Sequence, residues 1–397
     1  MKINKDNPSP EFISMMSGRY PVEPQIDKML VRKMERRSGS GYKQVPLDTI
    51  KSGIMSLLNK EIGSDYKISN CRWLTGGASK IQVAFTLEWQ KPDAGKVNEE
   101  LVVRMEPAES LVETSRLREF QLIKAVSSLV PVPEVRWVDE FGEYLPYPAL
   151  IYAYVKGVTK PSATTAGPSG VGTVLSKDLR EKLAPQFIGH LAAIHDFDFS
   201  GENLSAFTVP QPGIQHAEWS INWWDRVWEE DADEDIPLMR VASSWLRRNL
   251  PELDKPSIVH SDYRLGNFLF TEGDAKITAI LDWELGRIGD RHQDLAWTTS
   301  RAFAAMDESG KNLLICGMMP ESEFFDHYES ATEFKINPKT LHWYKIYNNY
   351  SLAALLVGTG YRIALNGKTH QDILVTWLIG LGYLVMDEIR QLLERGA

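Results

Sequence analysis

The chain has 397 residues, of which 43% are hydrophobic and 24% are charged. This length can bury a full hydrophobic core, and it suggests two or three domains or one two-lobed unit. The formal net charge of −9 argues against nucleic acid as the main partner, because contacts with phosphate favour a basic protein. The two cysteines, Cys71 and Cys316, are too few for a disulfide framework and indicate a reducing, cytoplasmic environment.

The sequence also argues against export and membrane insertion. Residues 1–20 contain no apolar segment of the kind that forms the core of a secretory signal. The longest apolar run, residues 373–386, is too short to span a bilayer and contains two glycines. We therefore expect a buried helix there and no membrane span.

Residues 1–45 differ in composition from the rest of the chain. They are polar, contain several prolines and carry a basic cluster, whereas the remainder is acidic. One short helix is predicted near residues 25–36. Its apolar residues would share one face: Ile26, Met29, Leu30 and Met34. We interpret residues 1–45 as an N-terminal extension that packs on the surface or is partly disordered, with an arm that binds a partner or a membrane surface as the alternative.

A helix is predicted at residues 47–62, where apolar residues recur with helical spacing and Gly63 stands at the C-terminal cap. The chain then passes Gly76, Gly77 and Ser79 and continues as a strand in which apolar and polar residues alternate. Its apolar face holds Ile81, Val83, Phe85, Leu87 and Trp89. A glycine-containing turn between strands can place backbone N–H groups over nucleotide phosphates, although tight hairpins also use glycine for conformational reasons alone.

The following segments complete a small sheet. Residues 91–100 are predicted to be a polar hairpin tip, and residues 101–105 the strand that returns from it. A helix is expected at residues 111–129, and further strands at residues 135–139 and 149–155. The residues of that helix expected to face inward are Leu117, Phe120, Ile123 and Val126.

Helices dominate from Asp178 onward. Tryptophans at helical spacing predict a helical core in residues 219–250, and the acidic run at residues 229–235 is expected to be a solvated loop. The same run is the feature that could serve a polycationic acceptor, which needs several converging carboxylates. The final residues, 320–397, are expected to be helical and to complete the core.

The most informative stretch lies at residues 258–284. A short apolar strand leads into a polar loop that holds His260, Asp262 and Asn267, and two strands joined by a glycine-containing connection follow. Asn267 enters the first of these strands, and Asp282 leaves the second. Antiparallel pairing would therefore carry both side chains to the same edge.

Such an edge suits phosphoryl transfer, in which positioning and charge neutralisation supply most of the catalysis. Asp262 would accept the proton of the acceptor hydroxyl, while Asn267 and Asp282 would hold Mg²⁺ through oxygen ligands, which a hard cation prefers. The alternative is that these polar residues only cap and brace a turn, as Asp and Asn often do. A zinc site of His260, Asp262 and His292 is less favoured, because neither the spacing nor any cysteine supports a ligand cluster.

These motifs resemble those of a known family. The strings H-S-D-x4-N at residues 260–267, L-D-W-E-x-G at residues 281–286 and G-D-R-H-Q-D-L-A at residues 289–296 are similar to the aminoglycoside phosphotransferase/choline kinase-like family, a branch of the protein-kinase-like fold. Residues 263–267 and 281–284 most resemble the phosphotransferase-like domain found with acyl-CoA dehydrogenases. The third string is similar to the antibiotic kinases.

The resemblance implies roles for individual residues. The nucleotide-binding residues that it implies are Gly76, Gly77, Ser79, Arg104, Glu119, Tyr152 and Tyr154. Arg104 would contact phosphates and pair with Glu119, and the wider fold uses Lys at its position. Because a guanidinium is larger and planar, the geometry of nucleotide binding can differ from that with Lys.

The remaining implied roles concern the catalytic loop. Asp262 and His260 would be catalytic, and Asn267 and Asp282 would bind the metal. Asp294 would brace the loop from within the larger lobe. His195 is expected to be a packed structural histidine.

We therefore expect an α+β, two-lobed protein-kinase-like fold. Residues 46–155 would form a nucleotide-binding N-lobe with a small antiparallel sheet, and residues 156–397 a large, mainly helical C-lobe for catalysis and acceptor binding. The predicted function is ATP- and Mg²⁺-dependent phosphoryl transfer to a hydroxyl of a small molecule, with GTP as the alternative donor. A hydroxylated organic or acyl metabolite is the favoured acceptor, and the alternatives are an aminoglycoside-type antibiotic kinase and a catalytically silent nucleotide-binding scaffold.

Overall fold

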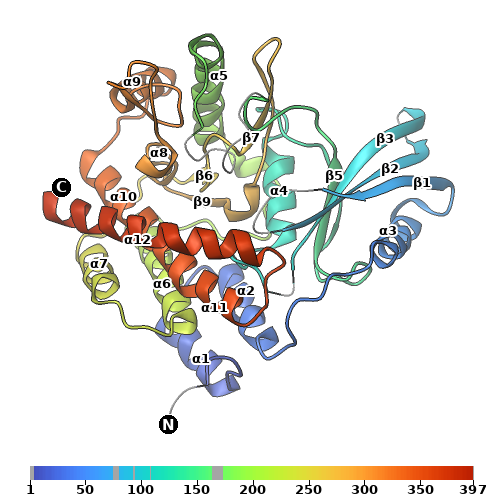
Figure 1. The fold of residues 1–397 in the computed structure, drawn as a ribbon, viewed down its shortest axis with the longest axis horizontal. Coiled ribbons are helices and arrows are strands. Elements are labelled where there is room, and N and C mark those ends of the chain that lie inside the picture. The colour runs from blue at the N-terminus through green and yellow to red at the C-terminus, as the bar shows by residue number, and fades with distance from the viewer. Residues whose placement is uncertain (1–3, 75–79, 93, 108, 163–172, 397) are drawn as a thin grey trace.

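A computed structural model describes residues 4–74, 80–92, 94–107, 109–162 and 173–396 of the chain. A sheet lies on one side of the molecule and a larger group of helices on the other (Figure 1). Five antiparallel strands form the sheet in the order β1-β2-β3-β5-β4. Their bounds are β1 (Tyr66–Trp73), β2 (Ile81–Lys91), β3 (Gly95–Met105), β4 (Val135–Asp139) and β5 (Ala149–Ala153).

The alternating sequence of β2 explains how the sheet is covered. Its five apolar side chains, from Ile81 to Trp89, are at most 8% exposed. They share one hydrophobic cluster with the buried face of helix α3 (Leu47–Ile62). Gly63 follows α3 with a φ of +80°, a conformation that glycine adopts without steric cost. The predicted helix and the predicted alternation are both confirmed.

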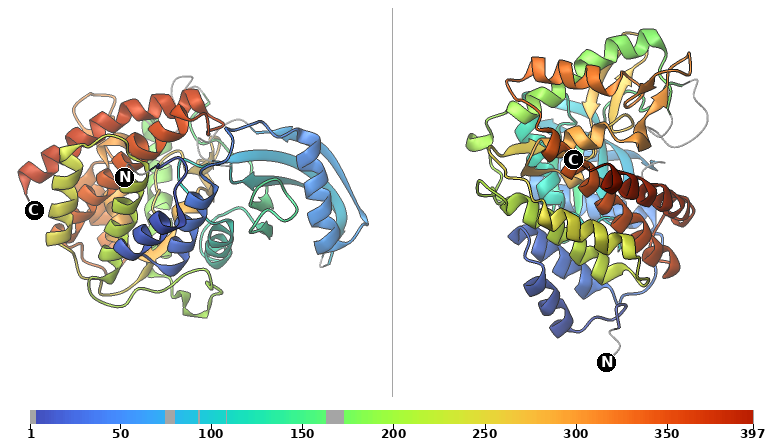
Figure 2. Two further views of the ribbon diagram at one scale, coloured as in Figure 1. Left: turned by 90° about the horizontal axis from the view of Figure 1, so that it is seen from below. Right: turned by 90° about the vertical axis from the view of Figure 1, so that its left-hand side faces the viewer.

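Strand β3 is longer than the sequence predicted. The prediction of a hairpin tip at residues 91–100 is wrong, because the ladder between β2 and β3 continues out to the pair Lys91 and Gly95. Polar residues can extend a strand where the hairpin projects beyond the core, since its outer positions face solvent. Figure 2 shows this sheet extending away from the helical part.

The helical part contains most of the remaining chain. Its helices are α5 (Lys177–Asp196), α6 (Gln215–Asp231), α7 (Pro237–Arg248), α8 (His292–Thr298), α9 (Glu321–Ala331), α10 (Pro338–Ala353), α11 (Tyr361–Leu365) and α12 (Asp372–Arg395). Its short strands pair as β6 (Ser257–Val259) with β9 (Arg287–Gly289), β7 (Phe268–Thr271) with β8 (Lys276–Ile280), and β10 (Ala305–Met306) with β11 (Leu313–Leu314). The expectation that helices dominate this part is confirmed.

Helix α4 (Arg116–Val126) lies between the sheet and the helical part and is shorter than predicted. Ser115 caps it by accepting a hydrogen bond from Arg118 N at 3.4 Å, so the helix begins there and not at residue 111. The predicted inward face is partly wrong, because Leu117 is only half-buried while Leu122 is fully buried.

Residues 1–45 contain two helices, α1 (Pro10–Arg19) and α2 (Pro24–Arg36). The predicted α2 is confirmed, and its apolar face joins the hydrophobic core of the helical part. Helix α1 was not predicted, because it contributes only a small buried cluster centred on Phe12, Ile13 and Met16. Figure 2 shows both helices packed beside the helical part.

The acidic run at residues 229–235 is a solvated loop only in its second half, where Asp233, Glu234 and Asp235 follow α6 and are exposed. Glu230 and Asp231 end α6 and are at most 1% exposed. Asp231 Oδ2 contacts Lys33 Nζ at 2.5 Å, and its Oδ1 pairs with Arg37. Buried carboxylates need such partners. The prediction failed for Asp231 because the cations that neutralise it lie about two hundred residues earlier in the chain.

The apolar run at residues 373–386 forms most of α12, but the prediction of a buried helix is wrong for one of its faces. Val375 and Val385 are buried, whereas Ile373 is 84% exposed and Leu384 69% exposed. In the part of the chain that the structure describes, no helix combines the length and the apolar character needed to cross a membrane.

Candidate active site

The hairpin β7–β8 brings two predicted metal ligands to one end of the helical part. Asn267 precedes β7 and Asp282 follows β8, and the two strands pair Phe268 with Ile280. Leu281 N also donates a hydrogen bond to Asn267 O at 2.7 Å. The expectation that antiparallel pairing places Asn267 and Asp282 at the same edge is confirmed.

Asp262 lies in the loop after β6 and contacts three side chains. Its Oδ1 contacts Arg264 Nε at 2.9 Å and accepts a hydrogen bond from Trp297 Nε1 at 2.7 Å, while its Oδ2 accepts one from Asn267 Nδ2 at 2.5 Å. Burial raises the pKa of Asp262 above its ordinary value; Arg264 opposes this shift, and the nearby Asp282 adds to it. The carboxylate therefore holds a proton more readily than an ordinary aspartate does.

His260 is fully buried, and both of its ring nitrogens contact the backbone. Its Nε2 lies 2.8 Å from Leu281 O, and its Nδ1 accepts a hydrogen bond from Asp262 N at 3.2 Å. Because a carbonyl oxygen can only accept, Nε2 must carry the proton. The ring thus ties the loop of Asp262 to the strand end next to Asp282.

Asp294, in the first turn of α8, holds the same loop from the other side. Its carboxylate accepts hydrogen bonds of 2.7 Å from the backbone N–H groups of His260 and Ser261. Ser261 has a φ of +67°, which is costly for a residue other than glycine and needs support from its surroundings. His195 contacts Asp294 Oδ2 at 3.1 Å and Tyr328 Oη at 2.7 Å. The predictions that Asp294 braces the loop and that His195 is structural are confirmed.

Arg104 on β3 connects the sheet to this edge. Its Nε lies 3.3 Å from Glu119 Oε1 on α4, and its Nη2 lies 2.6 Å from Asp282 Oδ1. Burial would lower the pKa of Arg104, but these two carboxylates and Glu284 outweigh it, so the guanidinium stays charged. The pairing of Arg104 with Glu119 that the resemblance implied is confirmed.

Arg104 is surrounded by a buried ionic cluster, and sequence reasoning missed this cluster. Glu284 Oε2 contacts Lys80 Nζ at 3.0 Å and Arg104 Nη2 at 3.1 Å. Arg116, at the start of α4, pairs with Glu119 and reaches Glu106 Oε2 with its Nε at 3.2 Å. Only two signals could have found this cluster: Glu284 stands beside Asp282 in the D-W-E string, and Arg116 precedes Glu119 by one helical turn.

The predicted nucleotide-binding residues of the sheet are only partly brought together. Tyr152 on β5 is paired with Val102 and lies next to Arg104, and burial raises its pKa to about 12. Tyr154 N donates a hydrogen bond to Glu100 O at 2.8 Å, and its side chain is 38% exposed. The predicted glycine-loop residues Gly76, Gly77 and Ser79 lie outside the described residues.

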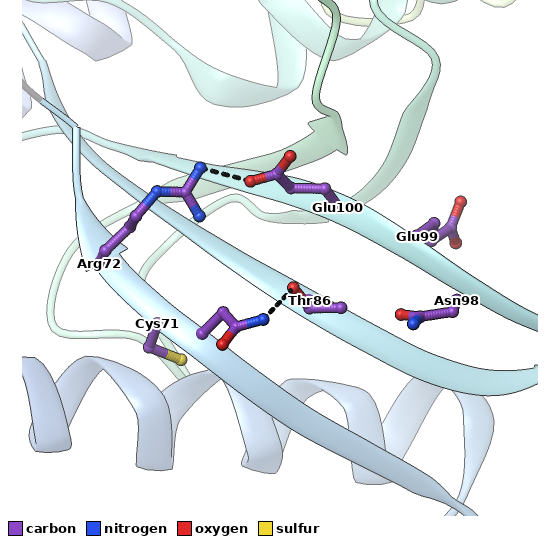
Figure 3. A pocket seen from close by; sticks show the side chains of 7 residues that line it. Cys71, Arg72, Thr86, Asn98, Glu99 and Glu100 are labelled. Atoms are coloured by element: carbon purple, nitrogen blue, oxygen red, sulfur yellow. Dashed lines mark hydrogen bonds and ion pairs between the residues drawn. The ribbon is translucent and has the colours of Figure 1, made fainter.

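A hollow of about 680 Å³ lies on the sheet and is lined by residues of β1, β2 and β3 (Figure 3). Four of the polar groups that line it contact one another, in the pair of Arg72 with Glu100 and the hydrogen bond from Asn70 Nδ2 to Thr86 Oγ1 at 3.3 Å. The hollow contains none of the predicted site residues.

Comparison with known proteins finds a matching family and several relatives. The model of the phosphotransferase enzyme family matches residues 89–314. Acyl-CoA dehydrogenase family member 10 of Mus musculus is 25% identical over 279 residues, which are 68% of this chain and 25% of that protein. The chain spans about a quarter of the length of the curated relatives it matches first.

Two solved structures are similar in fold. A candidate aminoglycoside phosphotransferase from Ralstonia eutropha has a TM-score of 0.60 at 20% identity, over 86% of this chain and 98% of that one. Aminoglycoside phosphotransferase APH(4)-Ia, solved with AMP-PNP and hygromycin B, has a TM-score of 0.51 at 15% identity, over 85% of this chain and 98% of that one. The predicted family and the two-lobed α+β fold are confirmed.

Proposed function

Because this chain belongs to the phosphotransferase enzyme family, we propose that it transfers the γ-phosphoryl group of ATP to a hydroxyl of a small molecule, with Mg²⁺. The observation that carries this proposal is the convergence of Asp262, Asn267 and Asp282 at one hairpin end, where Arg104 from the sheet meets them. A catalytically silent scaffold would have no chemical need for that set.

Asp262 is the proposed general base. As the acceptor oxygen forms its bond to phosphorus, the carboxylate takes the hydroxyl proton, and the bond to the ADP leaving group breaks. Its raised pKa suits a group that must accept a proton. His260 is better suited to positioning Asp262 than to exchanging protons, because both of its nitrogens are occupied by backbone contacts.

Arg104 is the proposed contact for the nucleotide phosphates, held in place by Glu119. Residues 46–155 would bind the nucleotide, with Gly76, Gly77 and Ser79 at the phosphates and the segment of Tyr152 and Tyr154 at the base. Residues 156–397 would bind the acceptor. GTP in place of ATP stays an alternative donor.

Asn267 and Asp282 are chemically suited to hold Mg²⁺, which prefers oxygen ligands. Asn267 Nδ2 donates to both Asp262 O and Asp262 Oδ2, so its amide orientation is determined and its Oδ1 is the atom left for a metal. Asp282 uses Oδ1 for Arg104, which leaves Oδ2. When bound, the ion would neutralise charge on the phosphate oxygens.

The acceptor is proposed to be a hydroxylated organic or acyl metabolite that carries a negative charge. Arg264 contacts the proposed base and would meet an anionic acceptor, whereas a polycationic aminoglycoside needs converging carboxylates. Two carboxylates of the acidic run that could have served such an acceptor, Glu230 and Asp231, are held in the core by Lys33, Arg37 and Arg226. The similarity to acyl-CoA dehydrogenase family members also supports this acceptor class.

A coupled assay of ADP release tests the proposal. The panel contains hydroxy acids, their thioesters, choline, kanamycin and hygromycin B, each with ATP and Mg²⁺. We expect release above background with a hydroxy acid or its thioester. Efficient phosphorylation of the antibiotics alone would reverse the choice of acceptor, and tight ATP binding without release for any acceptor would favour the scaffold.

A further inference from the structure

A second cavity, of about 270 Å³, lies where separate segments of the chain meet. The end of α2, residue 109 after β3, the connection from β4 to β5 and the connection from α11 to α12 all contribute to its wall. Tyr42 N donates a hydrogen bond to Gly367 O at 2.8 Å, which fixes two of these segments together. The volume is close to the lower end of small-molecule sites, about 300 Å³. None of its lining residues belongs to the candidate active site.

Positive charge is in excess around this cavity. Arg36 and Lys368 line it. Arg36 shares the single carboxylate of Glu113 with Arg32, at 2.7 Å and 3.0 Å. Lys368 Nζ donates to the backbone carbonyls of residues 37, 39 and 40, and no carboxylate of the described residues lies within ion-pair distance of it. The three N–H groups of its ammonium are therefore used by the chain, while its charge adds to the positive potential of the cavity.

Two further cations, Lys33 and Arg37, lie near the wall. Lys33 and Arg37 share one carboxylate, that of Asp231. Arg37 Nε reaches Glu109 Oε1 only at 3.7 Å, too far for a hydrogen bond.

Glu109 is the acidic group in the wall. It is 6% exposed, and its Oε1 is buried without a hydrogen-bond partner among the described residues. Burial raises the pKa of Glu109, although Arg37 opposes the shift.

Two aromatic and two proline side chains line another part of the wall: Phe141, Tyr147, Pro146 and Pro148. Phe141 is 67% exposed on the rim, and Tyr147 stands between two prolines in the same connection. We propose that this cavity binds a small organic anion, in which a phosphate or carboxylate meets Arg36, whose Nε has no hydrogen-bond partner among the described residues, near the charge of Lys368, and an apolar body packs on Phe141 and Tyr147. This inference does not depend on the proposed function.

Titration calorimetry with phenyl phosphate tests the proposal, with benzoate, inorganic phosphate and phenol as comparison ligands. Phenyl phosphate should bind more tightly than inorganic phosphate or phenol, and benzoate distinguishes a carboxylate from a phosphate as the preferred group. Arg36→Gln should weaken the binding of phenyl phosphate about tenfold, the loss expected for one charge-assisted hydrogen bond. Arg240→Gln, on an exposed ion pair, is the control and should change nothing.

Two further variants keep the test independent of folding defects. Glu109→Gln removes an acidic group from the wall and should tighten binding several-fold, a gain that a misfolded protein cannot imitate. Phe141→Ala changes only the exposed rim and should weaken phenyl phosphate but not inorganic phosphate. The proposal is overturned if phenyl phosphate does not bind, if none of these variants alters its affinity, or if Arg104→Gln abolishes binding, since the ligand would then occupy the candidate active site.

Discussion

The side-chain amide of Asn267 donates a hydrogen bond of 2.5 Å to the carboxylate of Asp262. The proposed metal ligand thus orients the proposed base directly, and the same amide also holds the backbone oxygen of Asp262 at 2.9 Å. A substitution of either residue should therefore change the position of the other side chain. Metal binding by Asn267 and proton transfer by Asp262 can be tested separately only with substitutions that keep this hydrogen bond.

Asp262→Asn should remove turnover while nucleotide affinity stays nearly unchanged. An amide cannot accept the hydroxyl proton, and a general base contributes a factor of about 10²–10⁴ in rate. Steady-state assays and ATP titration calorimetry on the same preparation measure both effects. A variant that keeps more than about a tenth of the wild-type rate would rule out the proton-accepting role.

Asp282→Ala should abolish the Mg²⁺ dependence of ATP binding, because it removes a carboxylate ligand at the hairpin end. Asn267→Ala should weaken that dependence less, since a neutral oxygen is a poorer ligand than a carboxylate. It should also slow turnover, because Asp262 loses its hydrogen bond from the amide. Calorimetry with and without Mg²⁺ is the measurement, and unchanged Mg²⁺-ATP affinity in Asp282→Ala would disprove the metal assignment.

The pH dependence of kcat/KM should report the raised pKa of Asp262. The carboxylate is the active form, so activity should rise with pH through a value above about 3.9, the ordinary pKa of aspartate. Trp297→Phe removes the indole N–H that stabilises the carboxylate at 2.7 Å, so the acid limb should move to higher pH. Trp245→Phe, on α7, is the control. An acid limb that stays in place or moves to lower pH in Trp297→Phe would contradict this role.

Asp231→Asn should destabilise the protein by about 3–5 kcal/mol at neutral pH, because it leaves Lys33 and Arg37 buried without their shared carboxylate. Burial alone would raise the pKa of Asp231, but these two cations outweigh it and lower that pKa. The stabilisation is therefore present above the unfolded pKa of about 3.9 and declines as the pH falls below it, so the difference between variant and wild type should shrink in acid.

Denaturant unfolding at several pH values measures the effect of Asp231→Asn. Asp235→Asn, in an exposed ion pair with Arg240, is the matched control and should cost less than about 1 kcal/mol. Equal unfolding midpoints for Asp231→Asn and wild type would show that α2 is not anchored through this carboxylate.

The hairpin geometry was predictable because it is local. The positions of Asn267 and Asp282 follow from the pairing of two adjacent strands, and the resemblance to a known family supplied Arg104 and Glu119. The roles proposed for these residues stay predictions, whereas their relative placement is confirmed.

The contacts that could not be predicted join distant parts of the chain. Lys80 and Glu284 are about two hundred residues apart, as are Lys33 and Asp231, and no spacing rule connects such pairs. The prediction that α12 is buried failed for another reason. A continuous apolar run has no periodicity that indicates which side of the helix is covered.

Transfer of the γ-phosphoryl group itself is the most direct test of the central claim. The protein is incubated with Mg²⁺, a pool of hydroxylated acids and thioesters, and ATP whose γ-phosphate carries heavy oxygen, and the products are analysed by mass spectrometry. We predict an acceptor that gains the labelled phosphoryl group with the wild-type protein and not with Asp262→Asn. Binding of ATP without any labelled acceptor, or equal labelling by both proteins, would contradict the claim.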